Sequence, residues 1–270
     1  MRCSCRLALW ALAVAQIFAS SPSWGLENPS CSRVIFSAHP EYPPYQWAEG
    51  EILRGASAEI TTTILNELGI KAENRSVGSW QSVLQAAREG SIDLVLALKR
   101  VPEREEYLAF TETPFATNPM AVFMLRERAV PLEDWELLAG KIGSVTLGDR
   151  YGDAFDRFAA ARLTLVPSAD LASNFRILLA GNADYVVTGL YPGRAYLARA
   201  GLAERIVPLT PPLNQGEIHH GFSRRSPCQS LIPAFNRKLQ EMTENGQIAA
   251  ALERGLQQWA ARSGGKAATR

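Results

Sequence analysis

The same succession of a helix, a turn and a buried strand is encoded twice in this 270-residue chain, at 79–98 and at 172–188. Each copy has a helical segment, a glycine-containing turn (EGSID or AGNAD) and an apolar run that follows an aspartate. In the first copy, Ser79 is a typical helix N-cap and Gly90 a typical helix stop. A strand that is apolar throughout is typical of a parallel sheet with helices on both faces. The repeat therefore predicts an α/β protein with two lobes, each containing a largely parallel sheet.

The remaining segments continue this alternation. The run SRVIFSA at 32–38 predicts a strand, because it is short, apolar and rich in β-branched and aromatic residues. Isoleucines and leucines at helical spacing predict a helix over 57–68, which Gly69 ends. Further elements are expected at 141–147 (strand), 152–161 (helix), 163–166 (strand), 183–191 (strand, ending at a Pro-Gly turn), 218–223 (strand), 231–244 (helix) and 246–261 (helix).

The composition excludes two classes of protein. Hydrophobic residues make up 47% of the chain and charged residues 20%, so the chain lacks the low hydrophobicity and high net charge of disordered proteins. The formal net charge is +1, whereas a nucleic-acid-binding protein needs a surplus of lysine and arginine to neutralise phosphates. We therefore expect a folded protein whose partner is a small molecule and not a nucleic acid.

Residues 1–25 have the pattern of an export signal. Two basic residues, Arg2 and Arg6, precede the apolar run LALWALAVAQIFA, and the small, polar segment SSPSWG follows it. This order is that of a secretory signal peptide, and cleavage after Gly25 fits it. A membrane anchor is the alternative, but spanning a bilayer takes about 20 apolar residues and this run is shorter. We expect a periplasmic protein.

Two cysteines, Cys31 and Cys228, remain after such cleavage. An even number in an oxidising compartment predicts one disulfide, and two separately buried thiols are the alternative. A disulfide would return the C-terminal helices to the first lobe, so that the chain crosses between the lobes twice and forms a hinge. The expected organisation is a discontinuous first lobe of 26–122 plus 218–270, a second lobe of 126–212, and two hinge strands near 122–126 and 210–217.

Several short motifs, taken in order, resemble one known family. They are EYPPYQW followed by Gly50 and Gly55, a tryptophan-initiated helix ending in REGSIDLV, Glu103-Arg104 with Phe110 leading into TETPF, AGNADYVV, and the ending NRKLQEMTENGQIAAALERGLQQW. Their order and spacing resemble the extracellular solute-binding proteins of family 3, the polar amino-acid type of ABC-importer binding protein. The resemblance implies a two-lobed, type II periplasmic-binding-protein fold that closes on a small polar solute. It also implies a monomer that delivers this solute to an ABC permease.

The resemblance implies ligand-binding residues in the first lobe. An aromatic residue at Tyr42 would cover the solute, with Tyr45 or Trp47 beside it, and packing under the PPY turn is the alternative for these rings. Arg104 lies where the family places the arginine that binds the solute's carboxylate, which suits a planar, permanently charged guanidinium. The alternative for Arg104 is a surface ion pair with a neighbouring glutamate.

Other positions depart from the family pattern. Ala97 and Lys99 replace small hydroxyl residues before the arginine, and Lys99 would either project into the cleft or lie in solvent at a strand end. At a helix start in the second lobe, a Gly-Thr turn becomes Gly148-Asp149-Arg150, whose main-chain amides could still receive an anionic group. Gly189 stands near the strand end where amino-acid binders have an aspartate for the α-ammonium, and Tyr191 could supply a hydrogen bond there instead.

These departures predict a site with more positive than negative charge. A buried ammonium without a carboxylate is costly, so we expect an organic anion or an acidic or modified amino acid rather than a standard one. Asp149 or Glu217 could replace the missing aspartate. The expected activity is capture by hinge closure, without catalysis. The alternatives are a soluble ligand-sensing module and an enzyme like the cyclohexadienyl dehydratases on this fold, with Glu217 or Asp149 as the acid.

No cofactor and no metal are expected. The sequence has no P-loop, Rossmann fingerprint, nucleophile elbow or H-E-x-x-H motif. The pair His219-His220 is a poor chelate, because neighbouring residues of a strand point to opposite faces. His39, close to Tyr42 in the cleft loop, is expected to make a polar contact or to shape the turn.

Overall fold

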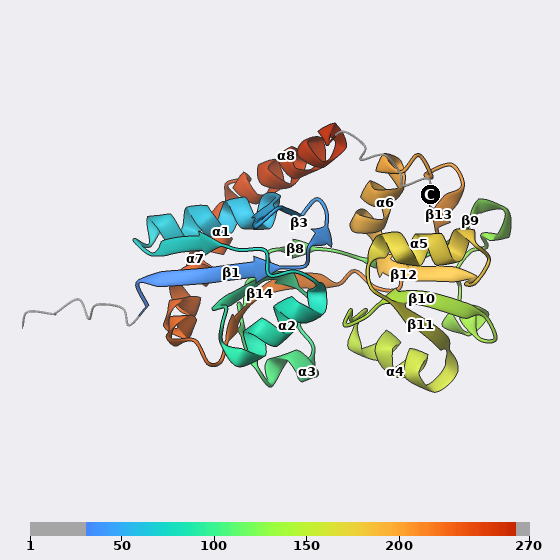
Figure 1. The fold of residues 1–270 in the computed structure, drawn as a ribbon, viewed down its shortest axis with the longest axis horizontal. Coiled ribbons are helices and arrows are strands. Elements are labelled where there is room, and N and C mark those ends of the chain that lie inside the picture. Colours follow the sequence, from blue (N-terminus) through green and yellow to red (C-terminus); the bar gives the residue numbers. More distant parts are fainter. Residues whose placement is uncertain (1–30, 263–270) are drawn as a thin grey trace, which may run out of the picture.

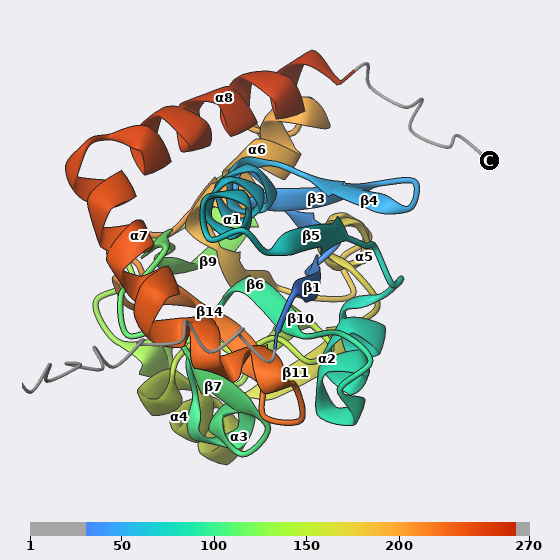
Figure 2. The same cartoon turned by 90° about the vertical axis from the view of Figure 1, so that its left-hand side faces the viewer.

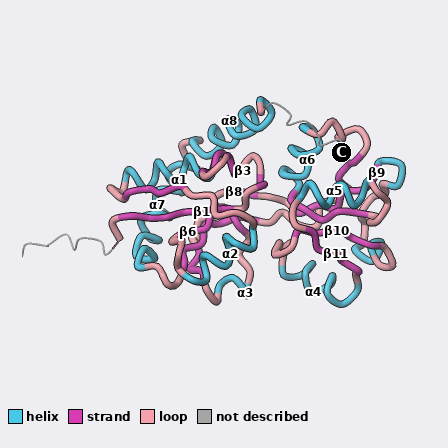
Figure 3. The backbone as a smooth tube through the Cα atoms, in the orientation of Figure 1, coloured by secondary structure: helices cyan, strands magenta, loops and turns pink. Residues whose placement is uncertain are grey.

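Two α/β lobes lie side by side along the long axis of the molecule, and each is built on its own sheet (Figure 1). The computed structural model describes residues 31–262. The first sheet has the strand order β5-β1-β6-β14-β7, with β8 paired to β14, and the second has the order β11-β10-β12-β9-β13. A separate three-stranded sheet, β2-β3-β4, completes the first lobe. Helices flank the strands of both lobes (Figure 3).

Both lobes alternate strands with helices. The first lobe contains β1 (Arg33–Ala38), β2 (Glu41–Tyr42), β3 (Gln46–Glu49), β4 (Ile52–Arg54), α1 (Ala56–Glu67), β5 (Lys71–Asn74), α2 (Trp80–Glu89), β6 (Leu94–Leu98), α3 (Pro102–Glu105), β7 (Leu108–Phe110), β8 (Ala116–Thr117), β14 (Glu217–Ser223), α7 (Ile232–Glu244) and α8 (Gln247–Ala261). The second contains β9 (Met120–Leu125), β10 (Ile142–Thr146), α4 (Asp153–Arg162), β11 (Thr164–Ser168), α5 (Leu171–Leu179), β12 (Tyr185–Gly189), α6 (Leu190–Arg199) and β13 (Ile206–Pro208).

Both copies of the repeated sequence pattern fold as helix, turn and buried strand. Ser79 caps α2 by accepting a hydrogen bond from the main-chain N–H of Ser82, and Gly90 ends this helix in the left-handed conformation with φ +76°. Asp170 caps α5 in the same way through the N–H of Ser173. Strands β6 and β12 are buried along their whole length, and each has a parallel neighbour in its sheet. The prediction of a mixed α/β fold is therefore confirmed.

The segment after β12 differs from the sequence expectation. The strand ends at Gly189 and α6 begins with the next residue, so Tyr191 lies in a helix rather than at a strand end. Proline is tolerated in the first turn of a helix, so Pro192 does not stop α6. A Cβ on Gly193 would come within 2.7 Å of a ring carbon of Phe123. The Pro-Gly pair therefore starts a helix and lets it pack closely on β9, instead of forming a turn.

The chain crosses between the lobes twice. The first crossing joins β8 to β9 through 118–119, and the second joins β13 to β14 through 209–216. Strand β9 pairs with β12 and β13 in the second sheet. The first crossing therefore comes earlier than the expected 122–126, because the apolar run of β9 completes the second sheet. That the two crossings act as a hinge remains a prediction.

A disulfide joins Cys31, ahead of β1, to Cys228 in the short 3-10 helix before α7, as the cysteine count predicted. Helices α7 and α8 pack on α1, and α8 also contacts α6 of the second lobe (Figure 2). The indole of Trp259 in α8 donates a hydrogen bond of 3.1 Å to the carbonyl of Ala195. The expected signal peptide lies outside the described residues. Within 31–262, no helix is both long and apolar enough to cross a membrane.

Candidate functional site

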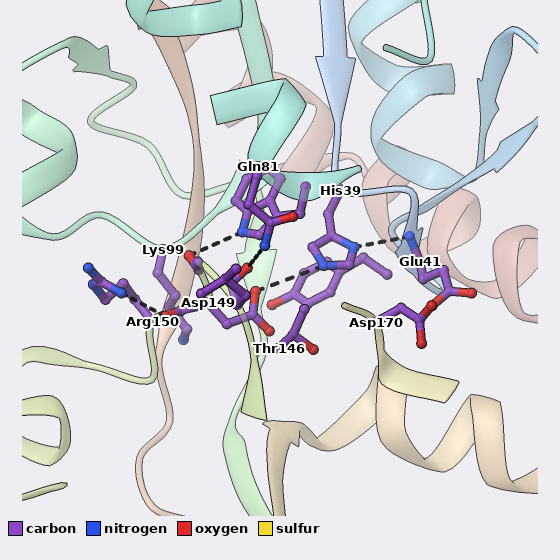
Figure 4. Close-up of polar contacts among 12 residues, drawn as sticks. His39, Glu41, Gln81, Lys99, Thr146, Asp149, Arg150 and Asp170 are labelled. Atoms are coloured by element: carbon purple, nitrogen blue, oxygen red, sulfur yellow. Dashed lines mark hydrogen bonds and ion pairs between the residues drawn. The ribbon is translucent and has the colours of Figure 1, made fainter. Parts of the chain in front are cut away.

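The loop 147–150, which follows β10, brings the second lobe against the first (Figure 4). The side-chain amide of Gln81 in α2 donates a hydrogen bond to the carbonyl of Leu147. The indole of Trp80 donates one to the carbonyl of Gly148 at 3.2 Å. Gly148 has a φ of +87°, a conformation that favours glycine, so the chain can place this carbonyl against the first lobe. The loop that sequence analysis assigned to solute binding thus also joins the lobes directly.

Arg104 in α3 is almost fully buried between the lobes, with 3% of its surface exposed. Its guanidinium donates hydrogen bonds to the carbonyls of Lys99 at 3.0 Å and Gly148 at 2.9 Å, and it lies 5.3 Å from the ring centre of Trp80. Burial lowers the pKa of Arg104, but a guanidinium stays charged at neutral pH. Within residues 31–262, no acidic side chain lies within 4.0 Å of it, because the neighbouring glutamates pair with other arginines. The surface ion pair considered as an alternative is therefore absent from this part of the chain.

The main-chain amides of the loop are less available to an anion than the sequence suggested. The N–H of Asp149 donates to the carbonyl of Thr146 at 3.0 Å, and the N–H of Tyr151 donates to the carboxylate of Asp156 at 3.1 Å. Arg150 lies at the rim, where its guanidinium pairs with a glutamate of α3. An anionic group would therefore meet side chains here rather than a free row of amides.

Asp149 of the second lobe faces His39 of the first (Figure 4). The distance from Asp149 Oδ1 to His39 Nε2 is 3.9 Å. His39 Nδ1 accepts a hydrogen bond of 3.0 Å from the N–H of Glu41, so the ring proton is on Nε2 and faces Asp149. Burial lowers the pKa of His39 to about 3, and burial raises the pKa of Asp149 to about 7 against the opposing effect of Arg104. The contact therefore joins a neutral imidazole to a carboxyl group that titrates near neutral pH.

Gly189 lies beside a residue that sequence analysis missed, Asn118. This asparagine is in the first crossing and has no exposed surface. Its amide donates a hydrogen bond to the hydroxyl of Tyr42, and its Oδ1 has no partner within the described residues. A Cβ on Gly189 would lie 2.9 Å from Asn118 Oδ1 and 3.0 Å from its Cγ. The asparagine thus fills the space that a side chain at 189 would need.

Lys99 and Ala97 complete the wall of the first lobe. The ammonium of Lys99 is buried and donates a hydrogen bond of 3.0 Å to the main-chain carbonyl of Asn118. Burial lowers the pKa of Lys99 to about 8, so it is still mostly charged at neutral pH. Ala97 has an unusual φ of +44°, and its N–H donates to Nδ1 of the buried His220 at 3.2 Å. Lys99 therefore lies inside the interlobe region and not in solvent at a strand end.

A cavity of about 20 Å³ lies at the centre of these groups, which is room for about one water molecule. Of the residues expected to bind solute, seven line this cavity and three lie outside it. The lining residues are His39, Tyr42, Trp80, Ala97, Leu98, Lys99, Arg104, Met120, Asp149, Arg150 and Gly189. The lobes therefore meet on protein groups, and a larger solute needs them to move apart.

Three predicted residues have other surroundings. Tyr45 is 1% exposed and donates a hydrogen bond of 2.6 Å to the carbonyl of Thr117. Trp47 is 2% exposed and packs edge-on against Trp259, with ring centres 5.4 Å apart. These two rings pack beneath the loop that carries Tyr42, which was the alternative considered for them. Tyr191, on α6, is exposed and faces a separate apolar groove.

Glu217 and the pair His219-His220 lie on β14 and do not line the cavity between the lobes. Glu217 lines a separate groove of about 600 Å³ and lies 3.6 Å from His219 Nε2, so it does not replace an acid at 189. His219 contacts the carbonyl of Thr111 through Nδ1, while His220 contacts Ala97 on β6. Within residues 31–262, no three histidine, cysteine or acidic side chains are grouped closely enough to hold a metal ion.

Comparisons with known proteins find a matching family and two partial sequence relatives. The sequence profile of the bacterial extracellular solute-binding proteins, family 3, matches residues 34–258. The arginine-binding extracellular protein ArtP of Bacillus subtilis is 26% identical over 117 residues, which are 43% of this chain and 44% of ArtP. The virulence sensor protein BvgS of Bordetella pertussis is 26% identical over 134 residues, which are 49% of this chain and 11% of BvgS. The chain thus matches less than half the length of either relative.

A solved structure extends the likeness to most of the chain. The substrate-binding protein AbpA of an amino-acid ABC transporter from Streptococcus pneumoniae, bound to L-arginine, superposes with a TM-score of 0.71 at 17% identity. The superposition covers 85% of this chain and 96% of AbpA. At this identity, the likeness shows a shared fold and says nothing of a shared ligand.

Proposed function

Because the chain belongs to the bacterial extracellular solute-binding proteins of family 3, we propose that it captures a small carboxylate-bearing solute between its two lobes. The solute would be an organic acid or an amino acid or derivative. The lobes would open to admit it and close over it, and the contacts made only in the closed form would hold them together.

The observation that carries this proposal is the environment of Arg104. A buried charge is unfavourable unless it is paired or fully hydrogen-bonded, and among the described residues the hydrogen-bond partners of this guanidinium are two neutral carbonyls. A carboxylate can accept two parallel hydrogen bonds from a guanidinium and also neutralises its charge. The carbonyl of Gly148 in the opposite lobe now accepts from one of these donors, so a solute carboxylate would take its place on the guanidinium.

The experiment is a thermal-shift screen followed by titration calorimetry. The panel contains amino acids, organic acids and amines, and a ligand at 100 times its Kd adds about 2.7 kcal/mol to stability. We expect carboxylates to raise the Tm and amines without a carboxylate to have no effect. Arg104→Ala should abolish the shift, while Arg157→Ala, on the exposed surface of α4, should preserve it. An unchanged shift in Arg104→Ala would exclude Arg104 as the carboxylate partner.

We further propose that the protein acts as a periplasmic monomer whose closed form is read by an ABC permease. The disulfide and the family support a location outside the cytoplasm. The partial likeness to the sensor BvgS supports the alternative of a ligand-sensing module. Uptake of the labelled solute by cells with and without the gene separates the two, because only an importer's loss abolishes uptake at low solute concentration.

A further inference from the structure

Gly189 lines one end of the cavity, and Asn118 lies directly behind it and behind Tyr42. Gly189 has no side chain, and the amide of Asn118 occupies the adjoining space. The ammonium of Lys99, whose residue also lines the cavity, is 3.0 Å from the main-chain carbonyl of Asn118. A solute held at Arg104 by its carboxylate would therefore direct its neighbouring substituent toward an amide and an ammonium.

The charges around the cavity oppose a second ammonium. Three cations, Lys99, Arg104 and Arg150, line it together with one acidic side chain, Asp149. Both guanidinium groups act on Asp149 electrostatically and favour its ionised form. A solute carboxylate would offset one of the remaining positive charges. An α-ammonium on the same solute would bring another positive charge to a cavity that already holds three cations against one acidic side chain.

Asn118 offers a partner of a different kind. Its side chain is fully buried and holds Tyr42 through its amide nitrogen, whereas Oδ1 has no hydrogen-bond donor within the described residues. A buried acceptor without a donor is unfavourable, so a solute group that donates there would be favoured. A hydroxyl can donate to Oδ1 and at the same time accept from the ammonium of Lys99. An oxo group can only accept, and an ammonium can only donate.

We infer that Asn118, acting with Lys99, determines specificity and selects a 2-hydroxy acid over the 2-amino acid of the same carbon skeleton. The inference rests on the proposed carboxylate capture at Arg104 and adds the identity of the neighbouring group. Asn118 lies in the first crossing, the segment predicted to act as a hinge strand, and would thereby connect recognition of the hydroxyl to closure.

The test compares matched solutes by titration calorimetry of the mature protein. Each set has one carbon skeleton with a hydroxyl, oxo or amino group at carbon 2, such as lactate, pyruvate and alanine, or malate, oxaloacetate and aspartate. We expect the hydroxy acid to bind at least about tenfold more tightly than the amino acid, which corresponds to about 1.4 kcal/mol. The affinity of the oxo acid should lie between those of the other two. It leaves Oδ1 without a donor, unlike the hydroxy acid, but it can accept from Lys99 and brings no positive charge, unlike the amino acid.

A variant places a carboxylate where the amide is now. Asn118→Asp should reduce the preference for the hydroxy acid by about tenfold or more, because the new carboxylate can pair with an α-ammonium. Asn182→Asp is the matched control, since Asn182 is exposed on a turn of the second lobe and should leave the preference unchanged. If Asn118→Asp does not fold, Asn118→Ser in the same assay should abolish the preference without reversing it.

The failure of this inference differs from failure of the proposed function. Equal or tighter binding of the amino acid or the oxo acid overturns the role of Asn118, while capture at Arg104 stands. A preference that survives Asn118→Asp unchanged also overturns it. Binding of no carboxylate in the panel overturns the proposed function and this inference together.

Discussion

A side chain at position 189 should destabilise the protein through Asn118. The Cβ of Gly189→Ala would lie 2.9 Å from Asn118 Oδ1 and 3.0 Å from Cγ, whereas carbon atoms in contact usually lie about 3.5–4.0 Å from their neighbours. Asn118 is fully buried and must rotate or shift, which breaks its hydrogen bond to Tyr42. Overpacking costs about 1–3 kcal/mol and the lost hydrogen bond about 1 kcal/mol. We therefore expect a loss of about 2–4 kcal/mol.

The assay is urea unfolding followed by circular dichroism, with the Tm as a second measure. For a chain of this size, about 2–4 kcal/mol lowers the Tm by roughly 5–15 °C. Asn118→Ala removes the colliding amide, so Gly189→Ala should cost less than about 1 kcal/mol in that background. A double-mutant cycle with no coupling between the two positions would refute this account, as would a Gly189→Ala protein as stable as its parent.

Further predictions concern the titration of the cleft, the disulfide, the lobe contact and catalysis. Burial raises the pKa of Asp149 to about 7, so the native state binds a proton at this carboxyl more tightly than the unfolded chain does. The protonated carboxyl therefore contributes stability at low pH, and this contribution is lost as the pH rises from about 4 to about 7. Asp149→Asn should therefore exceed its parent in stability at pH 8 and lose that advantage by pH 4, as urea unfolding at both values would show; an equal difference at both would contradict it. Reduction of Cys31–Cys228 should lower stability by about 5 kcal/mol in the loop-entropy account, measured by denaturation with and without reductant, and an unchanged midpoint would contradict this. Trp80→Phe keeps an aromatic ring but removes the indole donor to Gly148, so small-angle scattering should show a larger fraction of separated lobes than in the parent; an identical curve would contradict it. Prephenate and arogenate should not be turned over by the purified protein, and measurable product would revive the dehydratase alternative with Asp149 as the acid.

The fold was predictable because its signals are local. The caps Ser79 and Gly90 and the apolar run that follows them define a helix and a buried strand within twenty or so residues, and the second copy repeats the arrangement. The pairing of Cys31 with Cys228 followed from a count of two. Pro192 and Gly193 misled because a Pro-Gly pair fits both a turn and a closely packed first helical turn, and only the position of the neighbouring strand decides.

The site was only partly predictable because its properties depend on distant pairs. An aromatic residue such as Tyr45 or Trp47 is equally suited to covering a solute and to packing beneath a loop, so the sequence could not distinguish these roles. Asn118 has no local signal, since its importance comes from its contacts with Tyr42 and with the backbone of Gly189. An absence noticed in the sequence, the missing acid at 189, becomes interpretable only when the residue that occupies the space is known.

The carbonyl of Gly148 relates closure of the lobes to the strength of solute binding. It accepts hydrogen bonds from both Arg104 and Trp80, so the lobes are already joined through the guanidinium that we assign to the solute. A carboxylate at Arg104 displaces this carbonyl from the guanidinium. The net binding free energy is therefore the difference between a hydrogen bond to a charged acceptor and one to a neutral acceptor, not the full strength of the new bond. Only molecules with separated lobes can admit the solute, so the apparent affinity is also proportional to the fraction of molecules in that state. Weakening the Trp80 contact should therefore tighten solute binding as long as Arg104 is intact, whereas a cleft that gains its closing contacts only from the solute would bind less tightly after the same change.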